Sequence, residues 1–88
     1  MKPAKRITYG DISHLLEAEG FVKTTKREHA FFEHAAAGTS LVLPVKRANA
    51  SASPMHIAMT RLTLSDFGIL SQSDFDKWVA NPKRFQVA

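Results

Sequence analysis

The chain contains no cysteine, and this absence excludes several classes of protein at once. Disulfide-stapled secreted domains, thiolate metal centres and cysteine nucleophiles all need the missing residue. There is no internal repeat and no low-complexity block, and no apolar run approaches the roughly 18 residues that a membrane-spanning helix requires. The basic start, Met1 to Arg6, has no apolar run behind it and therefore does not resemble a secretory signal. We expect a cytoplasmic protein that is not bound to a membrane.

What the chain does contain is typical of an ordinary globular protein. Hydrophobic residues make up 44% of its 88 residues and charged residues 23%, unlike a disordered chain. This length predicts a single domain over residues 1–88, with a basic N-terminal arm (1–7) and a C-terminal tail (81–88). A domain of this size hides only about two-thirds of its unfolded surface, so we expect modest stability.

Positive charge is in excess, with 12 Lys and Arg against 8 Asp and Glu, a formal net charge of +4. The basic residues come in pairs: Lys5-Arg6, Lys26-Arg27, Lys46-Arg47 and Lys83-Arg84. Such a balance permits an electrostatic footprint for nucleic acid, and it is equally compatible with charge kept for solubility.

The first strong structural signal predicts a helix over residues 9–19. Thr8 is a good N-cap, and Asp11 lies where a carboxylate interacts favourably with the first-turn amides. Ile7 and Ile12 occupy the two positions of a hydrophobic staple, and Gly20 is typical of a left-handed residue that closes a helix.

Short β-forming segments follow, at residues 21–25, 29–34 and 40–45, separated by polar or glycine-containing turns. Three short strands with short connections predict an antiparallel meander, and Pro44 indicates either that the third strand lies at an edge or that it is about to end. A polar loop (46–54) then leads into the rest of the chain.

Two further helices complete the pattern. Ser53 and Pro54 are typical of a helix start, and Gly68 ends that helix. A short last helix is expected over residues 74–79, with Ser73 as its N-cap and a stop at Asn81-Pro82. The order α-β-β-β-α plus a short C-terminal helix predicts an α+β two-layer sandwich with a three-stranded antiparallel sheet. One face of that sheet is then open to solvent or to a ligand.

The histidines are the residues most suited to chemistry. His14 and His56 are interpreted as solvated or loop-facing, and no set of ligands has the spacing of a zinc site, so we expect neither a metal nor a cofactor. His29 begins the second strand directly after Lys26 and Arg27. Strand alternation places His29, Phe31 and Glu33 on one face of the sheet and the residues between them on the other. If Phe32 faces the helices, then His29, Phe31 and Glu33 line the open face.

An exposed imidazole, an aromatic ring and nearby cations are the groups that stack a base and handle a phosphodiester. A histidine suits RNA cleavage because its pKa, ordinarily near 6.5, allows it to give and take a proton at neutral pH. RNA supplies its own nucleophile, the 2′-hydroxyl, so proton transfer and charge stabilisation are sufficient. A turn hydrogen bond is the alternative role for His29.

Four segments, in order, resemble the HicA (YcfA-like) mRNA interferase toxins. The run Leu15 to Phe21 resembles the family's LL-x-x-x-GF signature between helix and strand. The segment 29–34 resembles its second strand, with a histidine at each end, and 41–44 resembles its third strand. The end of the family's second helix, T-L-R … A-G-(I/L) … E-F, is resembled by Thr60-Arg61-Leu62, Phe67-Gly68-Ile69 and Asp74-Phe75.

The resemblance implies a double-stranded-RNA-binding-like fold and a metal-independent endoribonuclease that cleaves mRNA and is covered by an antitoxin of the HicB type. It assigns the catalytic histidine to His29, while His34 occupies a common but not catalytic position. Basic residues would hold the RNA backbone: Lys23, Lys26, Arg27, Lys46 and Arg47. Phe31 joins them as the aromatic residue of the predicted RNA-binding set.

The chain also departs from the family. Arg27-Glu28 precedes His29 where the family usually has Gly-Ser, and Glu28 either repels phosphate or orients the imidazole. Two alternatives therefore stay open. One is a catalytically inactive RNA-binding or partner-binding module. The other is an interaction protein that uses the exposed sheet or Trp78 at a dimer seam, although Trp78 is better interpreted as a core residue.

Overall fold

The structure is a computed structural model that describes residues 6–82 of the chain. One helix, three strands and two helices follow one another: α1 (Tyr9–Ala18), β1 (Val22–Lys26), β2 (His29–His34), β3 (Thr39–Pro44), α2 (Pro54–Asp66) and α3 (Gln72–Ala80). The predicted α+β class with a three-stranded antiparallel sheet is confirmed. The predicted basic arm (1–7) and tail (81–88) lie mostly outside the described residues. In the described part of the chain, no helix is both long and apolar enough to cross a membrane.

Helix α1 begins at Tyr9 as its sequence predicts and ends at Ala18, one residue before the predicted end. The Asp11 N–H donates to the Thr8 hydroxyl and the Thr8 N–H donates to the Asp11 carboxylate, both at 3.0 Å, which completes a capping box. After the helix, Gly20 has a φ of +100°, and the Phe21 N–H donates back to the Leu16 carbonyl at 2.9 Å. This is a Schellman closure, and it explains why β1 begins at Val22 rather than at Phe21.

The sheet has the strand order β1-β2-β3, so β2 is central and β3 is an edge strand. It ends at Pro44, so both roles considered for this proline are observed. Pairing places Ala30 opposite Leu43 and Phe32 opposite Leu41. All four of these side chains are buried, so they form the face of the sheet that the helices cover. The alternate residues therefore lie on the uncovered face.

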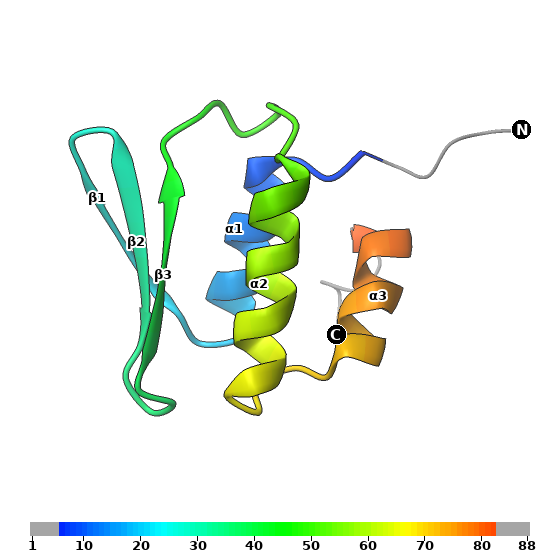
Figure 1. The fold of residues 1–88 in the computed structure, drawn as a ribbon. Coiled ribbons are helices and arrows are strands. Elements are labelled where there is room, and N and C mark those ends of the chain that lie inside the picture. Colours follow the sequence, from blue (N-terminus) through cyan, green and yellow to red (C-terminus); the bar gives the residue numbers. More distant parts are fainter. Residues whose placement is uncertain (1–5, 83–88) are drawn as a thin grey trace, which may run out of the picture.

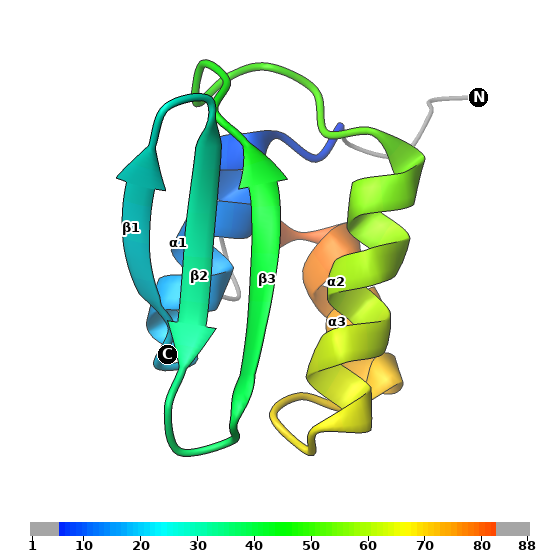
Figure 2. The same ribbon diagram turned by 60° about the vertical axis from the view of Figure 1, so that its left-hand side comes forward.

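The elements stack in layers (Figure 1). The sheet forms one layer, α1 and α2 lie against it, and α3 packs on the far side of these two helices. Figure 2 shows that the β1–β2 turn and the C-terminal end of β3 lie at the same end of the sheet. The helix layer therefore separates α3 from the strands.

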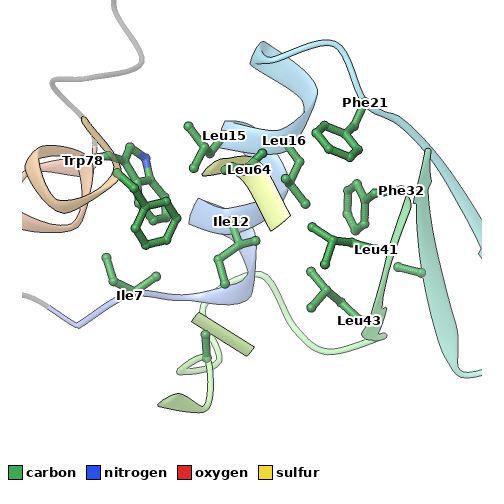
Figure 3. Close-up of a cluster of buried hydrophobic side chains, with 13 residues drawn as sticks. Ile7, Ile12, Leu15, Leu16, Phe21, Phe32, Leu41, Leu43, Leu64 and Trp78 are labelled. Atoms are coloured by element: carbon green, nitrogen blue, oxygen red, sulfur yellow. The ribbon is translucent and has the colours of Figure 1, made fainter. Parts of the chain in front are cut away.

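One core runs through these layers (Figure 3). Phe32 fills it on the sheet side, Ile12 and Leu16 fill it from α1, and Trp78 closes it from α3. The indole of Trp78 is fully buried, which confirms its interpretation as a core residue and removes it from any dimer seam.

The last two helices differ from the prediction in detail. Helix α3 begins at Gln72, because the Ser71 hydroxyl accepts a hydrogen bond from the Asp74 N–H at 3.1 Å; the prediction of Ser73 as N-cap is wrong. Helix α2 begins at Ser53 and Pro54 as predicted, but it buries only Thr60 and Leu64.

The loop between β3 and α2 is attached to the start of α1. The Gly10 N–H donates to the Ala48 carbonyl at 2.9 Å, and the Tyr9 N–H donates to the Ala50 carbonyl at 3.0 Å. A Cβ atom at Gly10 would lie 2.7 Å from the Ala48 oxygen. Glycine is therefore needed here for close approach of two backbones.

An ion pair connects the two C-terminal helices. The Arg61 guanidinium donates to both carboxylate oxygens of Asp76, at 2.9 and 3.1 Å. The hydrogen bond to Arg61 lowers the pKa of Asp76 below its ordinary value of 3.8. The pair is exposed to solvent, so we expect only a small contribution to stability.

Candidate nucleic-acid interface on the open face of the sheet

The uncovered side of the sheet, called here the open face, is defined by the pairing register. Side chains of adjacent, paired residues point to the same side, so three rows cross the strands: Val22–Glu33–Ser40, Thr24–Phe31–Val42 and Lys26–His29–Pro44. Because Phe32 is in the core, His29, Phe31 and Glu33 lie on the open face, as the sequence analysis anticipated for that case.

His29 is exposed at the end of the open face. Its ring centroid lies 6.2 Å from that of Phe31, with 49° between the ring planes. Within residues 6–82 we find no hydrogen bond from its imidazole, so the turn hydrogen bond considered as an alternative role is not formed there. The ring nitrogens of His29 are thus accessible to a ligand that approaches the sheet.

Apolar surface continues from His29 toward the middle of the sheet. Phe31 is half-buried, and its neighbour across the β2–β3 pairing, Val42, is 41% exposed. Val42 is not among the predicted site residues. In the sequence it lies between two leucines, and strand alternation places it on the face opposite to theirs.

Two of the predicted cations, Lys26 and Arg27, lie at the end of the sheet where His29 is, and Lys46 and Arg47 follow in the segment that starts beside the same turn. Lys26 is directly opposite His29 in the β1–β2 register, and Arg27 occupies the turn with a φ of +57°. The Val45 N–H donates to the Glu28 carbonyl at 3.0 Å, which holds the start of the next segment, with Lys46 and Arg47, at this turn. All four basic side chains are exposed.

Lys23 does not belong to this group. It is paired with Phe32, so its side chain lies on the helix-covered side of the sheet, where its Nζ is 5.8 Å from the centroid of the Phe32 ring. The structure therefore brings together Lys26, His29 and Phe31 on the open face, and it places Lys23 on the opposite face.

Two other histidines have structural partners. The Nδ1 atom of His34 accepts from the Ala37 N–H at 3.0 Å, so its Nε2 carries the proton and donates to the Glu19 carbonyl at 3.0 Å. His56 Nδ1 lies 2.8 Å from the Tyr9 hydroxyl. These contacts connect separate elements of the fold.

His34 and His56 are therefore occupied by packing, whereas His14 is exposed on α1, away from the open face. In residues 6–82, no three His, Asp or Glu side chains converge as a metal-binding group would. His29 is the histidine on the open face, where it lies beside Phe31 and opposite Lys26.

Comparison with protein-family models, with curated proteins and with solved structures finds no match. Function must therefore be inferred from the residues of this chain, and the resemblance to the HicA toxins stays a prediction.

Proposed function

We propose that this protein is a metal-independent endoribonuclease of the HicA type, with His29 as its general acid and base. The single observation that supports this most is the position of His29, which is exposed on the open face, opposite Lys26 and beside Phe31. Solvent access, an adjacent cation and an adjacent ring are what a phosphodiester with a flanking base requires.

The chemistry follows from RNA itself. Neutral His29 takes the proton from a ribose 2′-hydroxyl, and the 2′-oxygen attacks the neighbouring phosphorus. The bond from phosphorus to the 5′-oxygen of the next nucleotide breaks, and the imidazolium returns its proton to that oxygen. The products are a 2′,3′-cyclic phosphate and a 5′-hydroxyl, so no external co-reactant is consumed.

The neighbouring residues bind the substrate. Lys26 neutralises charge that develops on the non-bridging phosphate oxygens, because it lies across the strand pair from His29. Phe31 and Val42 offer a flat apolar surface for a base, and Arg27 with Lys46 and Arg47 holds adjacent phosphates at the end of the sheet.

This proposal includes a biological role. A small ribonuclease with an uncovered site degrades mRNA in the cytoplasm, and the resemblance supplies its regulator, an antitoxin of the HicB type that covers the open face. His29 is exposed on the open face, so its site is accessible to such a partner.

One observation favours a second candidate, an RNA-binding module without catalysis. Glu28 stands where the resembled family has a small residue, directly before His29 and in the turn that carries Arg27. A carboxylate there either orients the imidazole or repels phosphate, and in the second case binding would survive while cleavage is lost.

The experiment compares wild-type protein and His29→Ala on single-stranded RNA in EDTA. We expect cleavage to fall by about 10²- to 10⁴-fold in the variant, which is what general acid–base catalysis contributes. RNA affinity, measured in parallel by fluorescence anisotropy, should change little. Equal cleavage by both proteins would remove His29 from the mechanism. Salt-dependent binding by both, with cleavage by neither, would establish the second candidate.

A further inference from the structure

A cleft of about 300 Å³ lies on the helix-covered side of the sheet, between α1 and the three strands. Its lining includes Thr25 and Lys23 from β1, His14 and Glu17 from α1, and Lys46 from the segment after β3. The cleft is separate from His29, which lies on the open face.

The cleft exists because small residues of α1 face it. Gly10 and Ser13 line it, so α1 leaves space in front of β1 instead of filling it. The backbone contact of Gly10 with Ala48 holds the loop at one end of this space. A contact between two backbones, and not a flexible side chain, thus fixes this end of the cleft.

The bottom and the rim of the cleft differ in chemistry. Apolar residues of the sheet, Phe32 and Leu43 among them, form the bottom. Lys23, Lys46 and His14 lie at the rim with exposed side chains, and Glu17 is the acidic residue that lines the same cleft. The contact of Lys23 Nζ with the Phe32 ring keeps this ammonium group at the junction of bottom and rim.

Volume and charge together define the class of ligand. Small-molecule sites begin at about 300 Å³ and combine apolar walls with a few polar groups that fix orientation. The cleft is at the lower end of that range, so it suits one ring system with one anionic group. Two lysines favour phosphate over a neutral ligand.

We propose that this cleft binds a nucleoside monophosphate, with the base toward Phe32 and Leu43 and the phosphate between Lys23 and Lys46. The shared chemistry is a single nucleotide unit, whether it is a free mononucleotide or one nucleotide of an RNA strand. The cleft lies on the opposite side of the sheet from His29 and shares only Lys46 with the phosphate contacts proposed for RNA cleavage.

The probe is AMP, which contains no internucleotide phosphodiester and so reports binding without cleavage. We expect AMP to shift the backbone amide NMR signals of Ser13, His14 and Thr25 at low salt, while those of Phe31 and Val42 on the open face stay in place. Adenosine and inorganic phosphate should each bind at least about fivefold more weakly than AMP, because each lacks one half of the contacts.

Two variants test the cleft itself. Lys23→Gln should weaken AMP binding by about two- to fivefold, the range for an exposed charge contact, and Lys23→Arg should restore it. Lys77→Gln removes an exposed lysine of α3, outside the cleft, and should have no effect. Thr25→Trp should fill the space and reduce the affinity by at least about tenfold, whereas Thr25→Val preserves the volume and the binding.

If AMP alone shifts these amide signals, a free mononucleotide is sufficient to bind in the cleft. If the same signals shift only with a short single-stranded RNA, the cleft binds a nucleotide that is part of a strand. Either result supports the cleft. Shifts confined to the open face, adenosine binding as tightly as AMP, or unchanged affinity in both Lys23→Gln and Thr25→Trp would each overturn it. None of these outcomes alters the test of His29, because AMP binding and RNA cleavage are measured separately.

Discussion

The two faces of the sheet are built from alternate residues of the same three strands, and they differ in solvent exposure and in residue type. Phe31 and Phe32 are neighbours in the chain. Phe32 is 1% exposed in the core, while Phe31 lies half-buried on the open face beside His29. The partners make the difference: Leu41 pairs with Phe32 in a buried row, whereas Val42, which pairs with Phe31, is 41% exposed.

This comparison shows that stability and proposed function are divided between the faces. The covered face contributes the large apolar side chains that exclude water. The open face carries an imidazole, an aromatic ring and a lysine, none of which the core requires. Substitutions on one face should therefore leave the property of the other face nearly unchanged, and this separation can be tested.

The largest effect is expected for the two adjacent phenylalanines. Phe32→Ala should lower the free energy of unfolding by about 3–5 kcal/mol, since it removes a buried ring and leaves a cavity. Phe31→Ala should cost about 1 kcal/mol or less and instead weaken single-stranded RNA binding by about 1–3 kcal/mol, the contribution of one base stacked on an aromatic ring. Urea titration and fluorescence anisotropy measure the two quantities. Similar losses of stability in both variants would show that the faces are not divided in this way.

How far the sequence predicts this division depends on the strand. In β3, Leu41 and Leu43 alternate with Ser40, Val42 and Pro44, so the sequence indicates that the two leucines form the inward side. In β1 all five residues are exposed, and nothing in the sequence Val-Lys-Thr-Thr-Lys reveals which lysine faces the helices. Lys23 and Lys26 were accordingly assigned to one RNA-binding group, although the strand sends them to opposite faces.

The start of a helix can be predicted from the sequence when a few neighbouring residues determine it. Thr8 and Asp11 form a capping box that involves four residues only, so the start of α1 is predictable. At α3 two serines each precede an aspartate by three residues, Ser71 with Asp74 and Ser73 with Asp76. Both fit the pattern, and the structure uses Ser71, in a helix that buries Phe75 and Trp78 in the core. The cleft beside α1 also arises from contacts between distant segments.

A smaller effect is expected at Gly10, on the helix that covers the sheet. A methyl group there would lie 2.7 Å from the Ala48 carbonyl oxygen, so the loop has to move. Gly10→Ala should reduce the free energy of unfolding by about 1–2 kcal/mol, because overpacking outweighs the gain of about 1 kcal/mol in helix propensity. Thermal or urea unfolding measures the change. A stabilised variant would mean that this backbone contact is not formed.

A still smaller effect is expected from single charges of the open face. In the His29→Ala background, where RNA should stay intact, Lys26→Gln should reduce the slope of log K against log salt by about 0.7, the value for one phosphate contact to a single strand. Lys77→Gln, on α3, should leave the slope unchanged. Binding isotherms at several salt concentrations provide both slopes. Equal slopes for the Lys26 variant and its parent would remove Lys26 from the interface.

The smallest effect is expected farthest from both faces, at the ion pair between α2 and α3. Arg61 lowers the pKa of Asp76 below 3.8, so the folded state favours the carboxylate more than the unfolded state does. The stabilisation is therefore present above pH 3.8 and is lost as the pH falls through the lower folded pKa. Asp76→Asn should remove this acid-dependent loss while changing stability at neutral pH only slightly, because the pair is exposed. Unfolding curves for both proteins, recorded from neutral to acid pH, test this. If the free energies of unfolding of the two proteins run parallel at all pH values, the pair does not affect folding. If they differ at neutral pH and become equal in acid, the difference at neutral pH is the contribution of the pair.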